Sequence, residues 1–413
     1  MPATMYAIRR ARIAKTIGKG AHLLLCGATK LLRNDDVHFP FRQESNFFYL
    51  TGFDEPDAML LIIGGDEPHS TLFCAPKDKV VELWEGERIG PKKALRNFGF
   101  DEALPNTNKV LSERLLDAEK TSAPFTGDID ALIGEMRIIK DAGEIATMRT
   151  AAAISARAHR DVLSFVYSDM YEHEIEAALA FHFRKAGGDA LHAYPMIVAS
   201  GKNALTLHYT KNSSRTKSGD LLLIDAGCEY DKYASDITRT IPVSGVFTKA
   251  QRTLYKIVLR AQIEAISVIA PDIPIERVHY RACRVITEGL LDIGLIKAAS
   301  LDAALLEKRY KPFFPHGTSH WLGMDVHDAG DYCVDPETKA KMRLLEPGMV
   351  LTVEPGIYVR PSRDIPKEYW NIGIRIEDDV LVTDSGREVL SHLAPKDPDE
   401  IESLIASSNH QWW

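Results

Sequence analysis

Four carboxylates in the second half of the chain occupy unusual positions for charged residues. Asp225 directly follows the apolar run Leu221–Ile224, and Glu354 directly follows another apolar run. A second strand-like run follows in each case and carries a further carboxylate, first Asp236 and then Glu377. Charged side chains are rarely fully buried unless they are paired or bind a metal. One such residue is equally well explained by a buried ion pair, but four in matching contexts favour a metal site.

The chain between Asp225 and Asp236 is polar in its middle and predicts a hairpin. A hairpin would set the two carboxylates on adjacent strands, where they repel each other unless a cation lies between them. The alternative is that one aspartate is solvated and the other is paired with Arg239.

A short segment contains three histidines, His316, His320 and His327, interleaved with glycine and apolar residues. A lone histidine is usually a satisfied core or surface residue, whereas three at this spacing favour a functional site. By contrast, His173-Glu174 does not begin a zinc-protease H-E-x-x-H motif, because the position four residues after His173 is occupied by Ala177.

One imidazole and four carboxylates form an oxygen-rich ligand set without thiolate. Such a set suits manganese, cobalt or iron(II) at least as well as zinc, and it disfavours copper. Four carboxylates can bridge two ions, and a two-metal centre about 3.5–4 Å across can hold a water or hydroxide as the nucleophile. The residue types therefore predict a two-metal site suited to hydrolysis.

The elements that must hold these residues fall into two predicted domains. Apolar runs at 22–26, 58–63 and 70–74, separated by glycine and proline, predict strands of a small N-terminal α/β domain. The segment Asp117–Gly134 is loop-like in composition. We therefore expect a non-catalytic domain over residues 1–138 and a catalytic domain over residues 139–413.

The catalytic half predicts helices interleaved with two strand pairs. Helices are expected from residue 143, over 172–186, and from Thr248, which opens a capping box, to Pro271. Each strand pair begins with an apolar strand that ends in a carboxylate followed by x-Gly, and its second strand carries another carboxylate. This similarity indicates a weak internal duplication.

Composition excludes several other classes of protein. The chain of 413 residues is 45% hydrophobic, and its net charge of -8 argues against a nucleic-acid partner. No apolar run reaches 18 residues, so no membrane span is expected. Five scattered cysteines without a C-x-x-C pair indicate a reducing compartment. The basic N-terminus lacks an apolar secretion stretch and is expected to form a first helix rather than a transit peptide.

Several segments resemble the pita-bread peptidases, and within them the bacterial aminopeptidase P (Xaa-Pro aminopeptidase) family. In the second half these are IDAGCEYDKYASDITRT, HGTSHWLGMDVHD, LEPGMVLTVEPGIY and NIGIRIEDD; in the first half, FRQESNFFYLTGFDEP resembles the family's non-catalytic domain. The resemblance covers nearly the whole chain. It implies an α+β protein in which a small N-terminal α/β domain precedes a catalytic domain with the duplicated αβ, or pita-bread, fold.

The resemblance implies a role for each matching residue of the metal centre. Asp225 would chelate one metal, Asp236 and Glu377 would bridge both, and His320 and Glu354 would complete the second ion. Glu354 would also pass the proton between the bridging water and the leaving nitrogen.

The remaining matches surround the substrate. His327 is implied to bind the substrate carbonyl and stabilise the oxyanion. His208 and His316 are implied to line the pocket for proline, and Tyr194 is expected to line it with them. Arg375 and Tyr358 match positions that orient the metal ligands.

The implied activity is that of a cytoplasmic metallopeptidase, which releases the N-terminal residue from peptides with proline in second position. Its expected cofactors are two divalent ions per chain, manganese first, with cobalt, iron or zinc as alternatives. Its expected partners are Xaa-Pro peptides and further copies of the chain in a dimer or tetramer, with neither nucleic acid nor membrane. Trp84 matches an aromatic residue that reaches a neighbouring subunit's site in such an oligomer.

Other functions stay open on the sequence. A prolidase uses the same metal ligands but requires a dipeptide with a free carboxylate, for which Arg360 or Arg363 could supply the cation. A creatinase keeps the fold but lacks the full metal set. A pita-bread domain without catalysis could hold a peptide or protein, although the five intact ligand types argue against this reading.

Overall fold

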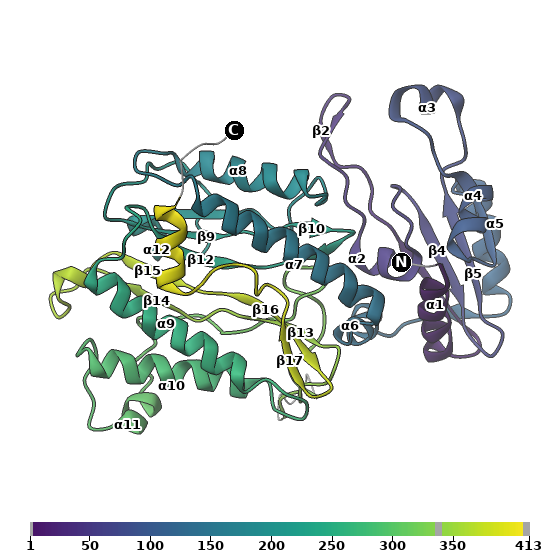
Figure 1. The fold of residues 1–413 in the computed structure, drawn as a ribbon. Helices are drawn as coiled ribbons and strands as arrows, with labels where there is room; N and C mark the ends of the chain where they lie inside the picture. Colours follow the sequence, from purple (N-terminus) through teal and green to yellow (C-terminus); the bar gives the residue numbers. More distant parts are fainter. Residues whose placement is uncertain (1–2, 335–340, 408–413) are drawn as a thin grey trace. The chain divides into compact units, whose positions relative to one another are not determined.

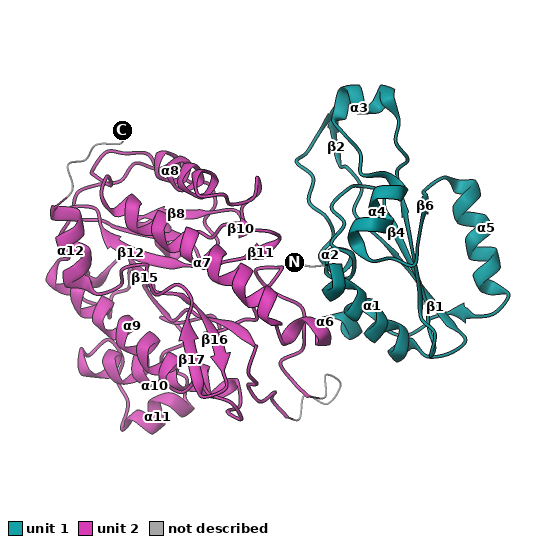
Figure 2. Ribbon diagram, turned by 45° about the vertical axis from the view of Figure 1, so that its right-hand side comes forward, with its two compact units in different colours: residues 1–133 teal, residues 134–413 magenta. Residues whose placement is uncertain are grey.

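The computed structural model describes residues 3–334 and 341–407. The chain divides into two compact units, residues 1–133 and residues 134–413 (Figure 2). The division falls within one helix, α6 (Ile129–Ile138), whose last residue is the predicted end of the N-terminal domain.

Unit 1 is a small α/β unit. Its helices are α1 (Ala3–Ile17), α2 (Ser45–Thr51), α3 (Lys79–Glu85), α4 (Gly90–Phe98) and α5 (Asn108–Glu119), and its strands are β1 (Ala21–Cys26), β2 (Leu32–Asn34), β3 (Val37–His38), β4 (Met59–Ile63), β5 (His69–Cys74), β6 (Glu102–Pro105) and β7 (Ala123–Pro124). Five strands form one sheet in the order β6-β5-β4-β1-β7. The three predicted strands and the predicted first helix are confirmed.

One expectation from composition is wrong. The segment Asp117–Gly134 was expected to be a loop, but helix α6 begins within it at Ile129. The side chains of Ile133 and Met136 are buried on this helix, so packing outweighs the polar composition of the preceding residues. Asp128 also accepts a hydrogen bond from the backbone of Ala131 at the helix start (2.9 Å).

Unit 2 carries the second half of the chain. Its further helices are α7 (Ala142–Leu163), α8 (Glu172–Lys185), α9 (Lys249–Ser267), α10 (Glu276–Asp292), α11 (Leu301–Leu306) and α12 (Pro398–Ala406), with short 3-10 helices at Gly201–Leu205 and Lys367–Tyr369. Its strands are β8 (Ile197–Ser200), β9 (Leu221–Asp225), β10 (Glu229–Tyr230), β11 (Tyr233–Ala234), β12 (Thr238–Pro242), β13 (Val350–Val353), β14 (Gly356–Val359), β15 (Ile372–Arg375), β16 (Asp378–Thr383) and β17 (Gly386–Val389).

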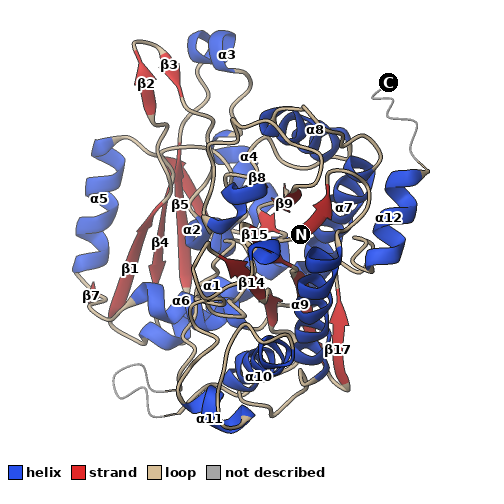
Figure 3. Cartoon of the chain, turned by 90° about the vertical axis from the view of Figure 1, so that its left-hand side faces the viewer, coloured by secondary structure: helices blue, strands red, loops and turns tan. Residues whose placement is uncertain are grey.

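The predicted helices of unit 2 are confirmed, and their ends have local causes. Thr248 and Gln251 form the capping box of α9, whose apolar face is buried in the core. The helix ends at Ser267, before Pro271. In Figures 1 and 3, α9 and α10 lie side by side, with α9 against strands β13 to β15, while α7 packs on β10 and β11.

Two strand pairs repeat one arrangement. β9 pairs antiparallel with β12, so that Asp225 lies opposite Thr238. β13 pairs antiparallel with β16, so that Val353 lies opposite Asp378. In both pairs, one carboxylate stands at the end of the first strand and another stands just before the second strand. The internal duplication expected from the sequence therefore has a structural counterpart.

Two further observations bear on the class of protein. No helix in the described residues is both long enough and apolar enough to cross a membrane. All five cysteines lie in the described part of the chain, and none of them forms a disulfide.

Candidate metal centre

A cavity of about 580 Å³ in unit 2 contains all five predicted metal ligands. Its lining also includes five other residues that the sequence singled out: Tyr194, His208, His316, His327 and Arg375. β9 ends at Asp225 and β13 ends just before Glu354, while β12 begins shortly after Asp236 and β16 begins just after Glu377. The two repeated strand pairs therefore direct their carboxylates into one space.

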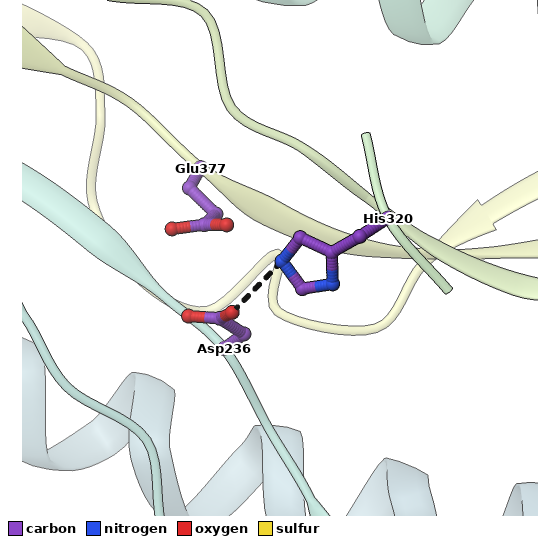
Figure 4. A group of neighbouring side chains, drawn as sticks. All are labelled: Asp236, His320 and Glu377. Carbon is purple, nitrogen blue, oxygen red and sulfur yellow. Dashed lines mark ion pairs between the residues drawn. The ribbon is translucent and has the colours of Figure 1, made fainter. Parts of the chain in front are cut away.

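Three of the ligands meet most closely. One side-chain atom each of Asp236, His320 and Glu377 lies within 4.8 Å of the other two, and all three residues are buried. Figure 4 shows them converging from three separate segments, with the Nε2 atom of His320 3.3 Å from Oδ2 of Asp236. This is the only group of three or more such ligands within reach of one ion in the part of the chain that the structure describes.

Tyr194 joins the first two carboxylates. Its hydroxyl oxygen lies 2.7 Å from Oδ1 of Asp225 and 2.6 Å from Oδ1 of Asp236. A hydroxyl has one proton, so it can donate to only one of the two carboxylates at a time. The carboxylate that does not receive this proton depends on its other partner, which is Arg375 for Asp225 and His320 for Asp236.

Arg375 holds two of the carboxylates. Its Nη2 atom donates to Oδ2 of Asp225 (2.5 Å), and its Nε atom donates to the hydroxyl of Thr238 (3.1 Å). Thr238 in turn donates to Oε2 of Glu377 (2.6 Å). One guanidinium thus orients Asp225 directly and Glu377 through a threonine hydroxyl.

The partners of His320 determine its tautomer. Its Nδ1 atom lies 3.0 Å from the carbonyl oxygen of Trp321 and must donate a proton to it. The Nε2 atom therefore faces Asp236 and Glu354, at 3.3 and 3.7 Å. A metal-binding histidine typically donates its other N–H to a carbonyl or carboxylate in this way.

His316 is held in the neutral form. Its Nδ1 atom donates to the carbonyl oxygen of Gly317 (2.7 Å), so its Nε2 atom accepts from the Tyr358 hydroxyl (2.9 Å). Tyr358 in turn accepts from Nη1 of Arg375 (3.0 Å). Burial, together with the charge of Arg375, lowers the pKa of His316 to about 3. The imidazole can therefore face a substrate without carrying charge.

The carboxylates are costly to ionise without a cation. Burial raises the pKa of Glu377 well above its usual range, and the charges of Asp236 and Glu354 raise it further. Burial also raises the pKa of Glu354 to about 7, although His320 and Arg375 act in the opposite direction. Divalent cations favour the ionised forms of the carboxylates that they bind.

The residues present fit a divalent metal centre. Four carboxylates line the cavity, whereas Arg375 is the only arginine or lysine among the described residues that line it. Carboxylate oxygens with one imidazole are ligands for manganese, cobalt, iron or zinc.

The structure decides one alternative left open by the sequence. Asp225 and Asp236 are both buried, so neither is solvated. Arg239 pairs with Asp378 (2.7 Å) and not with Asp236. The alternative of one solvated aspartate and one paired with Arg239 is therefore wrong.

Two predicted residues lie outside this cavity lining. Tyr358 is buried, and its hydroxyl forms hydrogen bonds with two residues of the lining, His316 and Arg375. Trp84 belongs to α3 in unit 1, where its side chain is 83% exposed.

Sequence reasoning missed three contacts. The hydroxyl of Tyr194 joins Asp225 and Asp236, Thr238 supports Glu377, and Asp379 accepts a hydrogen bond from the backbone N–H of Asp236 (3.1 Å). Thr238 and Asp379 stand in the same strand segments as the ligands, which was the available signal. Tyr194 lies in a loop before β8, where no spacing pattern points to its partners.

Comparison with protein families finds two matching models. Residues 146–384 match the model of metallopeptidase family M24, and residues 6–122 match the N-terminal domain of aminopeptidase P. The matched ranges lie within the two predicted domains and include the five predicted ligands.

Individual relatives are similar over nearly the full chain. The Xaa-Pro aminopeptidase of Escherichia coli K12 is 38% identical, with 98% of each chain covered, and human Xaa-Pro aminopeptidase 3 is 33% identical, with 98% of this chain and 86% of the relative covered. Among solved structures, Pseudomonas aeruginosa aminopeptidase PepP gives a TM-score of 0.92 at 39% identity, covering 100% of this chain and 99% of that one. Zn-substituted E. coli aminopeptidase P in complex with product gives 0.92 at 36% identity, with both chains fully covered (100%). The predicted fold class, a small α/β domain followed by a pita-bread domain, is confirmed.

Proposed function

Because the chain belongs to metallopeptidase family M24 and carries the N-terminal domain of aminopeptidase P, we propose a specific reaction for it. The chain releases the N-terminal residue of peptides whose second residue is proline. It is a metallo-aminopeptidase, and its relatives are named Xaa-Pro aminopeptidases. The observation that carries the proposal is the convergence of Asp236, His320 and Glu377 in a cavity that also holds Asp225 and Glu354.

We propose two divalent ions per chain, with manganese as the expected metal. Asp225 would hold one ion, His320 and Glu354 would hold the other, and Asp236 and Glu377 would bridge them. Such ions lower the pKa of a water molecule toward about 7 and so supply a nucleophile at neutral pH.

Glu354 is the proposed carrier of the proton. It receives the proton of the attacking water and delivers it to the leaving nitrogen. A carboxyl group whose pKa is raised by burial to about 7 is suited to both steps near neutral pH. Bound cations would lower that pKa, so the metal-loaded enzyme is expected to use Glu354 first as a base.

His327 is proposed to donate a hydrogen bond to the substrate carbonyl. It lines the cavity beside His320 but is not one of the three most closely gathered ligands. A donor at this place is most effective when negative charge develops on the carbonyl oxygen in the transition state.

The proline pocket is proposed to lie between His208 and His316. Both line the cavity together with Tyr194, and His316 is held neutral by its partners. A peptide bond to proline has no N–H, so a site that needs no such donor can cleave it while most general peptidases fit it poorly.

The nearest alternative, a prolidase, requires a cation for the dipeptide's carboxylate. Neither Arg360 nor Arg363 lines the cavity, and Arg360 donates to the carbonyl oxygen of Leu205 (2.6 Å). Arg375 does line it but already holds Asp225 and Tyr358. These positions favour an aminopeptidase, which leaves the chain beyond proline open to solvent.

Self-association in the cytoplasm is a further part of the proposal. Helix α3 exposes Val80, Leu83 and Trp84, and exposed apolar groups of this kind are common at protein interfaces. Mass measurement in solution distinguishes a dimer or tetramer from a monomer, and Trp84→Ser tests whether α3 contributes.

A comparison of peptides tests the proposed activity. Xaa-Pro-Yaa tripeptides and longer chains should be cleaved with higher kcat/KM than Xaa-Pro dipeptides, releasing free Xaa. A strong preference for dipeptides, lost on amidation of their C-terminus, would assign the chain to the prolidases. Arg360→Ala and Arg363→Ala, made separately, would then identify the residue that holds the carboxylate.

A further inference from the structure

A buried ionic cluster lies beside the histidine segment and contains no proposed metal ligand. The carboxylate of Asp328 binds Nη2 of Arg137 through one oxygen and Nζ of Lys140, at 3.0 Å, through the other. The three side chains are between 1% and 3% exposed. Apolar side chains can often replace a buried ion pair without loss of folding stability. Stability alone is therefore a weak explanation for these three charged residues.

Asp328 forms hydrogen bonds and close contacts within its own loop, residues 321–328. The backbone N–H of Asp328 donates to the carbonyl of Trp321 (3.0 Å), and the N–H of Asp325 donates to Oδ1 of Asp328 (3.3 Å). At Gly323 the carboxylate comes so close that an added Cβ would lie 2.1 Å from Oδ2. The loop 321–328 is thus closed by one side chain.

The two cations come from a distant and well-anchored segment. Arg137 is in the last turn of α6, and the backbone N–H of Lys140 donates to the carbonyl of Gly348 (2.9 Å), just before β13 begins at Val350. β13 leads directly to Glu354. Asp328 therefore ties the histidine loop to the same strand that presents a proposed metal ligand.

His327 immediately precedes Asp328 and depends on this loop for its place. Its ring forms no hydrogen bond to another described residue, and its ring contact is the stack on His320. Arg137 also binds Asp325 (2.7 Å), so the loop is held on both sides of Val326 and His327. The position of the His327 imidazole therefore depends on the backbone of this loop, which Arg137 and Lys140 hold through Asp325 and Asp328.

We propose that Arg137, Lys140 and Asp328 form a positioning cluster that holds His327 where it can reach the substrate carbonyl. The cluster acts through His327 and touches neither substrate nor metal. The proposal rests on the role proposed above for His327, and its test has one arm that does not depend on activity.

The first arm measures hydrogen exchange in the metal-free protein. Lys140→Met removes one cation and leaves the Arg137–Asp328 pair in place. We expect amides of the loop 321–328 to exchange about tenfold faster or more, because exchange reports local opening. Leu254→Ala, in the buried face of α9, is the control for general loss of stability and should not accelerate this loop selectively. If exchange in the loop were unchanged, the claim that the ionic cluster holds this loop in place would be wrong.

The second arm is a double-mutant cycle on kcat with metal-loaded enzyme. Lys140→Met should lower kcat roughly tenfold in the native background, since small displacements of a catalytic group are costly, and less than twofold when His327 is already alanine. Leu254→Ala should show no such dependence on His327. Equal losses in both backgrounds would contradict positioning through His327.

A further variant covers the case in which Lys140→Met does not fold. Arg137→Lys keeps the charge but cannot hold Asp325 and Asp328 with one guanidinium, and it should give the same pattern in both arms. If the unmodified enzyme does not cleave Xaa-Pro peptides, the proposed function fails, while the exchange arm still decides whether the cluster fastens the loop. If the exchange arm shows that the cluster holds the loop but His327→Ala leaves kcat unchanged, the proposed positioning role is wrong while the structural role of the cluster stands.

Discussion

The imidazole of His327 stacks on that of His320, with ring centroids 4.0 Å apart and ring planes at 23°. The two rings nevertheless have different surroundings. His320 is fixed between the Trp321 carbonyl and two carboxylates, whereas burial and the charge of His320 lower the pKa of His327. One ring is placed to bind metal and the other to remain neutral beside it.

Replacing His327 should therefore separate catalysis from metal binding. His327→Ala is expected to lower kcat by about 10²–10³, the loss typical for one oxyanion donor, with metal content unchanged. His320→Ala, the matched control, should lose metal as well as activity. A parallel fall of metal and activity in His327→Ala would show that the two histidines were assigned incorrectly.

Glu377 should be needed for metal retention. Its side chain is 2% exposed and is oriented by Thr238 toward Asp236 and His320. Glu377→Ala is expected to lose most bound metal after dialysis, as measured by elemental analysis. Asp101→Asn in unit 1, where the carboxylate binds Ser70, is the control and should retain full metal content. Retention of metal by Glu377→Ala would remove Glu377 from the ligand set.

The hydroxyl of Tyr194 should tune metal affinity. It contacts both Asp225 and Asp236, and loss of a group that orients metal ligands typically costs 10–100-fold in affinity or activity. Tyr194→Phe is expected to weaken manganese binding by about tenfold in chelator competition, with little change in fold. An affinity equal to that of the native protein would mean that the hydroxyl does not orient the ligands.

The metal-free protein should lose stability as the pH rises. In the folded state the pKa of Glu354 is raised from 4.5 to about 7 by burial, and the pKa of His320 is raised from 6.5 to about 9, because Asp236 outweighs burial. Both groups bind a proton more tightly in the folded state, so their stabilisation is complete below the unfolded pKa and is lost through the folded one. The melting temperature should fall between about pH 5 and 9.

Added manganese should oppose this fall, because the ligands bind metal in their deprotonated forms. Glu354→Gln is the control and should remove the part of the decline below about pH 7. A melting temperature that is constant or rises with pH in the metal-free protein would contradict the assigned shifts.

The four carboxylates of the candidate metal centre could be singled out from the sequence because their local context is anomalous. A carboxylate at the end of an apolar strand, as at Asp225 and Glu354, is visible without any structure. The capping box at Thr248 likewise predicted the start of α9 from local hydrogen bonding. Such features depend on neighbours within a few residues.

Contacts between distant segments were not predictable in this way. The sequence offers Arg239 as a partner for either Asp225 or Asp236, but its actual partner is Asp378 on β16. Nothing near Arg239 in the sequence distinguishes Asp378 from the other two carboxylates. The binding of Asp328 by Lys140 similarly joins segments 188 residues apart. Composition also failed at α6, where the buried face of the helix decides its structure.

Metal titration tests whether peptide cleavage depends on two bound ions. The metal-free protein is titrated with manganese while bound ions per chain and the rate of release of Xaa from an Xaa-Pro-Yaa peptide are measured together. We expect the rate to rise with occupancy and to reach its plateau at two ions per chain, as in a two-metal hydrolase. Full activity in protein that holds no more than a trace of metal would contradict it.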